Sequence, residues 1–178
     1  EFLRNLFLKS FTSGLAEPNK RVRESEWRNA MLDLRDSILY CPFCKAEQFY
    51  DPAKLKQTSG KPTPCWSCKK NYDLPYRLRL KRGYQEKVVL LNRDNELYGY
   101  HIGSNEDEIA LFDFTHPLAK VAQNPSDPTK WGLRNLSRTP WLVTVPNSET
   151  KEVEHGKVAP IVSMTKIHFG KVEGEIRY

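Results

Sequence analysis

The chain has 178 residues, of which 39% are hydrophobic and 28% are charged, and its formal net charge is +6. This composition is ordinary for globular domains and excludes collagen-like and fully disordered chains. No apolar stretch approaches the roughly 20 residues that span a bilayer, and the first residues lack the apolar core of a signal peptide, so we expect a soluble, cytoplasmic protein. The absence of an initiator Met indicates an excised or processed piece of a longer chain.

Residues 1–39 have the spacing of two amphipathic helices. Apolar residues recur every three to four positions in residues 2–11, and Gly14 closes this run. The same spacing predicts a second helix, whose apolar residues are Trp27, Met31, Leu34 and Ile38. We therefore predict a helical pair joined by a basic turn.

All four cysteines lie within residues 40–82, a region of short strands and prolines. They form two pairs, Cys41-x-x-Cys44 and Cys65-x-x-Cys68, with 20 residues between the pairs. Each two-residue gap folds into a tight turn that points both thiolates to one side, and this spacing is typical of a zinc ribbon. With no other ligand nearby in sequence, we predict one structural Zn²⁺ bound by all four cysteines. Two disulfides or a dithiol redox pair are the less favoured alternatives in a cytoplasmic chain.

A lysine follows each cysteine pair. Lys45 and Lys69 occupy positions where zinc ribbons often carry Gly, so a left-handed backbone at these lysines would cost roughly 1 kcal/mol relative to Gly. Together with Lys70, they are expected to offset the negative charge of four thiolates around one Zn²⁺.

Two dense basic runs, the second directly after the cysteine pairs, make a nucleic-acid-binding zinc ribbon a competing function. They are Lys20-Arg21-x-Arg23 and Arg77-x-Arg79-x-Lys81-Arg82. In the second run the charges alternate with Leu78 and Leu80, which is the pattern of a half-buried strand with a solvated outer face. We therefore regard nucleic acid as the less favoured partner.

Residues 83–178 have the pattern of an all-β sandwich. Apolar runs alternate with turn residues every 8 to 12 positions. Strands are predicted at residues 88–91, 98–102, 109–112, 131–136, 141–145, 161–164, 167–169 and 174–178. Residues 124–128 contain two prolines and are predicted to form a long surface loop. No catalytic motif is present in the sequence, so we expect neither an enzyme nor a small-molecule substrate.

The motif Phe11-x-x-Gly14-Leu15-x-x-Pro18-x-x-Arg21 is followed by Glu26-Trp27 and an amphipathic helix. In this order, these residues resemble the end of the C-lobe of a protein kinase, whose motif arginine pairs with a buried glutamate. The catalytic elements of a kinase are absent from the sequence, so the resemblance implies that Arg21 lacks its partner and that the helices carry uncovered apolar surface. Val22 and Arg23 replace the usual Pro and capping Ser/Thr, which predicts a weakly capped second helix.

Residues 100–103, 131–137 and 153–170 are similar to strands of a forkhead-associated (FHA) domain. Ser104 stands in place of the family's phosphate-binding arginine, which removes a bidentate, charge-assisted contact. Leu118 also stands where a histidine is usual. The resemblance thus implies an FHA-like sandwich that binds protein through its loops but has lost the usual phosphothreonine-binding residues.

The partner-binding candidates that follow from this resemblance are Ser104, Asn105, Arg134, Ser137 and Arg138. A phosphopeptide-binding FHA domain, with Arg134 or Arg138 replacing the lost arginine, is the alternative.

The order of the three regions, residues 1–39, 40–82 and 83–178, carries a further resemblance. It is similar to the C-terminal region of bacterial Ser/Thr kinases that are encoded beside a von Willebrand A-domain protein and a type 2C protein phosphatase. This triad is associated with tellurium resistance. The resemblance implies an α+β, multi-module, non-catalytic interaction region whose partner is the A-domain protein.

Overall fold

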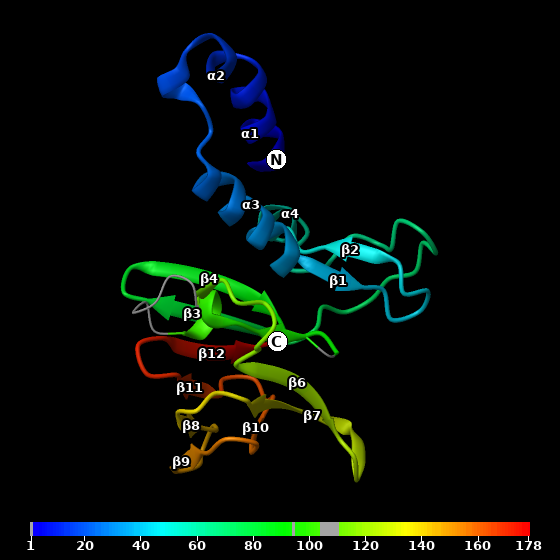
Figure 1. Cartoon of the computed structure of the whole chain (residues 1–178). Coiled ribbons are helices and arrows are strands. Elements are labelled where there is room, and N and C mark those ends of the chain that lie inside the picture. Colours follow the sequence, from blue (N-terminus) through cyan, green and yellow to red (C-terminus); the bar gives the residue numbers. More distant parts are fainter. Residues whose placement is uncertain (1, 94, 104–110) are drawn as a thin grey trace.

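The computed structural model describes residues 2–93, 95–103 and 111–178, and it is an α+β structure with three parts along the chain (Figure 1). The first part is helical, the second carries the cysteines, and the third contains two antiparallel sheets. Within these ranges, no helix combines the length and the apolar character that a membrane span requires.

The predicted N-terminal helical pair is confirmed. Its elements are α1 (Phe2–Phe11), α2 (Ser13–Ala16), η1 (Pro18–Lys20) and α3 (Glu24–Asp36). The ring of Phe7 packs edge-on against Trp27, with centroids 5.0 Å apart, and Lys9 pairs with Glu26 at 3.0 Å. These two contacts hold α1 against the first half of α3.

The start of α3 lacks a side-chain cap, as its sequence predicted. The carboxylate of Glu26 instead accepts a hydrogen bond from the backbone N–H of Arg23 at 2.8 Å. One half of a capping box therefore compensates for the missing Ser or Thr. The helix ends at Asp36, so Ile38 begins a strand instead of extending the apolar side of α3.

The second part, residues 38–74, is called the cysteine module. It contains β1 (Ile38–Tyr40), β2 (Glu47–Phe49) and α4 (Pro52–Gln57), and its hairpin points away from the two sheets (Figure 1). Asp51 caps α4 because its carboxylate accepts the backbone N–H groups of Ala53 and Lys54, at 3.0 and 3.2 Å.

The third part, called the β module, contains a six-stranded and a four-stranded antiparallel sheet. The order in the larger sheet is β4 (Gln85–Leu90), β3 (Arg77–Arg82), β12 (Glu173–Arg177), β11 (Lys166–His168), β8 (Trp141–Thr144) and β9 (Thr150–Val153). The order in the smaller sheet is β10 (Val158–Pro160), β7 (Asp127–Asn135), β6 (Ala119–Asn124) and β5 (Glu96–Leu97).

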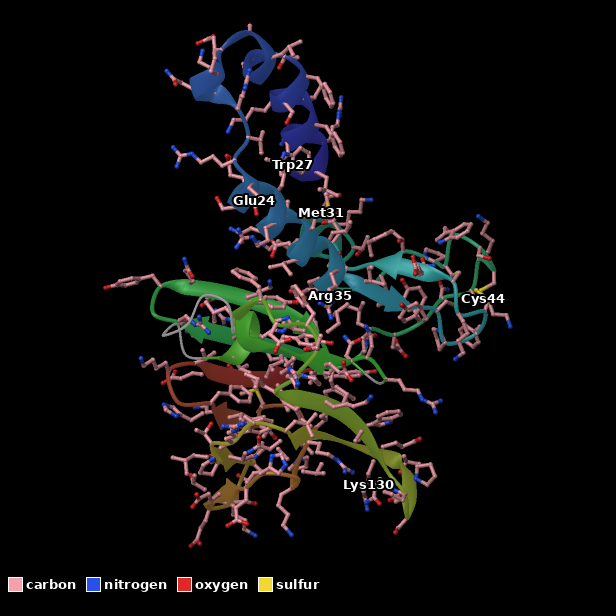
Figure 2. All side chains as sticks on the ribbon, viewed as in Figure 1. Glu24, Trp27, Met31, Arg35, Cys44 and Lys130 are labelled. Carbon is pink, nitrogen blue, oxygen red and sulfur yellow. The ribbon has the colours of Figure 1, made fainter. Side chains whose placement is uncertain are left out.

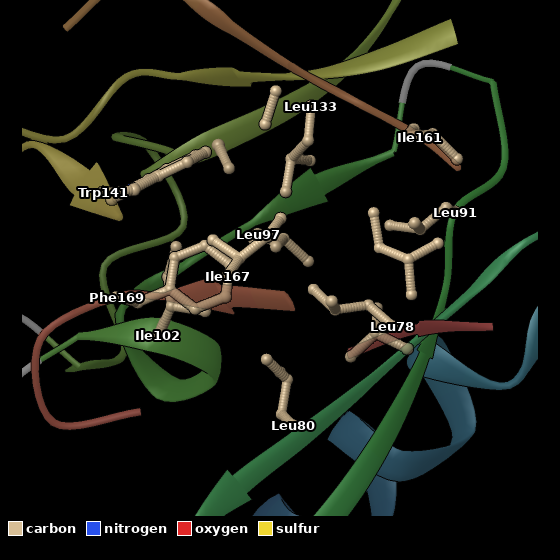
Figure 3. Packing of buried hydrophobic residues seen from close by; sticks show 14 of the residues in the cluster. Leu78, Leu80, Leu91, Leu97, Ile102, Leu133, Trp141, Ile161, Ile167 and Phe169 are labelled. Atoms are coloured by element: carbon tan, nitrogen blue, oxygen red, sulfur yellow. The ribbon is translucent and has the colours of Figure 1, made fainter. Parts of the chain in front are cut away.

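One hydrophobic core joins the two sheets (Figure 3). Leu78 and Ile167 enter it from the larger sheet, and Leu133 enters it from the smaller sheet. Trp141 is 1% exposed and packs edge-on against Phe169, with ring centroids 4.9 Å apart. In β3, β6 and β8 alternate residues are buried, which is why the sequence of these strands shows a period of two.

Strand β3 belongs to the larger sheet, although residues 77–82 fall within the range assigned to the cysteine region. It is hydrogen-bonded between β4 and β12, so the sheet begins before the predicted boundary at residue 83. The inward Leu78 and Leu80 are buried, while Arg79 and Lys81 face outward. The alternation predicted from the sequence is confirmed. Burial of the two leucines in the core explains why β3 pairs with strands of the larger sheet.

Three predicted segments have different structures. Residues 98–102 were expected as a strand, but Gly99–Ile102 form the short helix α5, because the Nδ1 atom of His101 accepts the backbone N–H of Tyr98 at 3.0 Å. Residues 124–128 form a tight hairpin turn instead of a long loop, since β6 and β7 pair as far as Asn124 and Asp127. Residues 161–164 form a turn after β10. Of the expected strand at 109–112, residues 109–110 lie outside the described residues, and residues 111–112 are not in a strand.

A buried polar cluster connects α3 to the β module. The carboxylate of Asp36, 8% exposed, pairs with Lys87 at 2.7 Å and lies 3.1 Å from Nε2 of His101. The hydroxyl of Tyr100 donates to the same carboxylate at 2.9 Å. Because the Nδ1 atom of His101 is an acceptor, its Nε2 carries the proton and donates to Asp36. We call these four residues the Asp36 cluster.

Candidate metal centre

Two backbone turns of equal geometry present the four cysteines. In the first turn, Cys41 N–H donates to Ala46 O at 3.0 Å and Lys45 N–H donates to Cys41 O at 3.0 Å. The second turn has the same two hydrogen bonds. Cys65 N–H donates to the carbonyl oxygen five residues later at 3.0 Å, and the backbone N–H four residues later donates to Cys65 O at 2.9 Å. The local sequence therefore builds the same ligand-bearing turn twice.

The left-handed backbone expected after each cysteine pair is present. Lys45 has φ 64° and Lys69 has φ 61°. Each conformation closes its turn at a cost of roughly 1 kcal/mol, because a side chain beyond Gly crowds the following carbonyl there. Formation of the site must offset this cost in both turns.

The four sulfur atoms lie close enough together to share one metal ion. Cys41 and Cys68 Sγ lie 3.7 Å apart, Cys44 and Cys65 Sγ lie 3.6 Å apart, and all four sulfurs lie within 4.8 Å of one another. A regular tetrahedron with metal–sulfur bonds of about 2.3 Å has sulfur–sulfur distances of about 3.8 Å. A disulfide needs about 2.05 Å, and all four thiols are free. The cluster can therefore hold one metal ion with four sulfur ligands.

The ligands differ in exposure. Cys41 and Cys65 are fully buried, Cys68 is intermediate, and Cys44 is exposed at the end of the module that points away from the sheets (Figure 2). Cys44 is thus the most solvent-exposed of the four cysteines.

Backbone N–H groups surround the sulfurs and affect their protonation. The Ala46 N–H donates to Cys44 and lowers the pKa of that thiol to about 6. The Lys70 N–H acts in the same direction on Cys68, but burial and the neighbouring thiols raise the pKa of Cys68 to about 11. A metal must displace the remaining thiol protons, so metal binding releases protons.

Gln48 on β2 contacts the second cysteine turn and was missed by the sequence analysis. It is 6% exposed on β2, its Nε2 donates to Cys65 Sγ at 3.4 Å, and its Oε1 accepts the backbone N–H of Trp66 at 3.4 Å. A polar residue that orients a ligand from outside the coordination shell is common at metal sites. A glutamine on a three-residue strand has no sequence pattern that identifies this role.

The lysines that follow the cysteine pairs lie along the turns. Lys45 Nζ donates to Pro42 O at 3.2 Å, and Lys69 Nζ donates to Trp66 O at 2.6 Å. The Nζ of Lys70 in the second turn lies 4.9 Å from the ring centroid of Phe43 in the first. Three ammonium groups therefore lie on the two turns that carry the sulfurs.

The partner-binding candidates of the β module lie in different places. Ser104 and Asn105 fall outside the described residues. Ser137 is 7% exposed, donates to Asn135 Oδ1 at 2.7 Å and accepts the Trp141 indole N–H at 3.2 Å. Its hydroxyl therefore stabilises the loop after β7.

The two candidate arginines are separated. Arg138 is exposed and lines a cavity of about 570 Å³, together with Gly103, Pro117 and Lys171 from neighbouring loops. Arg134 is exposed on β7, next to a different cavity of about 400 Å³. Only one of the two arginines lines the cavity that also contains Ser137.

No family model matches the chain, and no curated protein matches it.

Proposed function

We propose that the chain is a zinc-stabilised, non-catalytic interaction region of a bacterial Ser/Thr kinase, and that its β module is FHA-like and docks a folded protein. The observation that carries this proposal is the 570 Å³ cavity at the loop end of the β module. Residues that the FHA resemblance associated with binding, Ser137 and Arg138, line it beside Gly103. The partner that the domain order implies is the von Willebrand A-domain protein of the kinase triad.

Zn²⁺ is the metal that best suits the cysteine cluster, and the cysteine module is then a zinc ribbon. Four sulfur ligands at tetrahedral spacing are typical of structural zinc, and with every position filled by protein the metal has no open site for chemistry. In this proposal Zn²⁺ joins the two turns and fixes the module between the helical pair and the β module. Elemental analysis is expected to give about one zinc per chain, and two disulfides without metal would contradict the assignment.

The helical pair supports the kinase part of the proposal. Phe11 and Leu15 are both 72% exposed, and Met31 on α3 is 45% exposed (Figure 2). Burying such side chains is worth roughly 1.5 to 3 kcal/mol each, so their exposure is costly and indicates a surface covered by other protein. The rest of a kinase C-lobe would supply that cover.

Calorimetry with the A-domain protein tests the docking function. We expect Arg138→Glu to weaken binding by at least ten-fold, because it reverses a charge at the cavity. Arg134→Glu is the matched control, since it makes the same change on an exposed strand position away from that cavity. Absence of binding by the unmodified chain at tens of micromolar would exclude this partner, and equal effects of both variants would exclude the cavity.

Phosphopeptide binding is the second candidate function. Of the two candidate arginines, Arg138 is the better phosphate ligand in this case, because it lines the cavity that also contains Ser137. An exposed guanidinium beside neighbouring loops can pair with phosphate through two parallel hydrogen bonds. Phosphothreonine peptides and their unphosphorylated forms distinguish this candidate from docking of a folded protein. Equal binding of the two peptide sets would exclude it.

A further inference from the structure

The two cysteine turns form an exposed aromatic and basic surface that the proposed function does not use. It consists of residues 42–46 and 66–71 and is called the knuckle surface. Trp66 is 65% exposed and Phe43 is 55% exposed, although both belong to the turns that carry the ligands. The same segments contain three lysines and no acidic residue.

The aromatic rings of this surface are held in place. The indole N–H of Trp66 donates to Glu47 O at 2.8 Å, which fixes the ring while most of it stays in contact with solvent. Lys70 Nζ lies over the Phe43 ring, 4.9 Å from its centroid, so a cation lies against one face of the exposed ring. A fixed aromatic ring loses little conformational freedom on binding, which favours stacking of a flat group on it.

The lysines supply positive charge beside the rings. Lys45 and Lys69 donate to carbonyl oxygens of their own turns, at 3.2 and 2.6 Å, and thus hold their ammonium groups at the surface. Neither basic run noted in the sequence is part of this surface. In the second run, Arg79 pairs with Glu86 at 2.5 Å on the outer face of the larger sheet.

We propose that the knuckle surface binds single-stranded nucleic acid, with bases stacked on Trp66 and Phe43 and phosphates placed beside Lys45, Lys69 and Lys70. Every base has a π-face that can stack on an exposed ring, and each phosphate carries the charge that complements an ammonium group. A folded protein partner usually needs about 800 Å² of surface on each side. Two short turns at the end of a projecting hairpin suit an extended strand better than such an interface.

Binding of fluorescein-labelled eight-nucleotide oligothymidylate and oligouridylate to the zinc-loaded full chain tests the proposal. Anisotropy is measured between 20 and 300 mM salt. With three phosphates neutralised, log K is expected to fall against log salt with a slope of about −2, since each phosphate contact on a single strand contributes about −0.7. The two oligonucleotides show whether the surface distinguishes DNA from RNA.

Matched variants locate the binding. Trp66→Leu is expected to weaken binding by about 5- to 150-fold, because one stacking platform is lost. Tyr84→Leu is its control, since Tyr84 is a fully exposed aromatic residue outside the cysteine module. Replacing the three lysines by Gln is expected to bring the salt slope close to zero, whereas Lys151→Gln on β9 leaves it unchanged. Zinc content is measured for each variant to confirm that the turns are formed.

Several outcomes would overturn the proposal. One is no binding of either oligonucleotide at about 100 μM protein in low salt. Another is binding that Trp66→Leu and the lysine variant leave intact in zinc-loaded protein, because the contact then lies elsewhere. A third is equal competition by an oligoglutamate of the same charge, which would show an acidic peptide surface without base stacking.

Discussion

The cysteine module and the β module are stabilised by different means. The buried apolar side chains that the structure describes in the cysteine module are Leu39, Leu55 and two of the cysteines themselves. The β module has one continuous core with contributions from both sheets. A region with so little apolar burial cannot offset its loss of conformational entropy without additional bonds. If the four cysteines bind a metal, we therefore expect the cysteine module to depend on it for stability and the β module not to.

Metal removal is expected to have the largest effect and to separate the two modules. Stripping the metal with a chelator, or changing Cys65→Ser, should unfold residues 38–74, because structural zinc contributes on the order of 10 kcal/mol to small metal-dependent folds. The core around Trp141 should stay folded. Hydrogen exchange by mass spectrometry compares protection of β2 with protection of β8.

The control for this experiment is re-addition of Zn²⁺ to the stripped unmodified protein, which should restore protection of β2. Loss of protection in both modules at one chelator concentration would show that the two regions unfold as a single unit, and the comparison would then be wrong.

Leu78→Ala is expected to give the next largest loss of stability. It tests whether β3 stabilises the β module or the cysteine module. Leu78 is fully buried in the core shared by the two sheets, so the truncation should destabilise the β module by about 2 to 5 kcal/mol. Urea unfolding followed at the β module measures this change, while the zinc content should stay the same. Loss of zinc in folded Leu78→Ala protein would instead assign β3 to the cysteine module.

The sequence predicted well that the four cysteines come together, because each pair is set by local chemistry. A two-residue gap determines a turn, and the left-handed positions of Lys45 and Lys69 follow from that turn. Leu78 and Leu80 equally predicted a half-buried strand. Their period does not state which sheet they join, since the partners β4 and β12 are chosen by distant parts of the chain.

Side-chain contacts between distant segments could not be predicted. Asp36 and His101 meet across 65 positions of sequence, and each alone resembles an ordinary surface residue. Gln48 contacts Cys65 across 17 positions of sequence. In each case the pairing depends on tertiary packing that no local pattern encodes.

Asp36→Asn tests the connection between α3 and the β module, and we expect a smaller effect than for Leu78→Ala. Loss of the charge leaves the partly buried Lys87 without its nearest carboxylate, which should cost about 2 kcal/mol. Asp33→Asn is the matched control, since Asp33 pairs with the same lysine at 3.3 Å but its side chain is 60% exposed, and it should cost below about 0.5 kcal/mol. Hydrogen exchange of the backbone amides of α3 measures the loss of stability in both variants. Equal effects would contradict a role for burial.

The Asp36 cluster should also make this connection sensitive to acid. Burial lowers the pKa of His101, so the unfolded chain binds a proton that the folded chain excludes as pH falls through about 6.5. Burial raises the pKa of Asp36, but His101 and Lys87 more than offset this and lower it, so its contribution is lost at more acidic pH. The free energy of unfolding should therefore fall from pH 7 to 5. In His101→Gln, the free energy of unfolding measured by urea at each pH should depend less on pH over this range. An unchanged slope in the variant would contradict the assignment.

Lys69→Gly is expected to have the smallest effect, and its sign separates backbone strain from side-chain bonding in the cysteine module. Glycine relieves the left-handed conformation by roughly 1 kcal/mol but removes the ammonium bond to Trp66 O and adds freedom to the unfolded chain. Because an exposed bond of this kind is worth less than the strain, we expect a net gain of a few tenths of a kcal/mol. Lys70→Gly, at a position without positive φ, should destabilise the module by about 0.5 to 1 kcal/mol. Competition with a zinc chelator measures both variants, and a loss for Lys69→Gly equal to that for Lys70→Gly would mean that the turn carries no strain for the metal to offset.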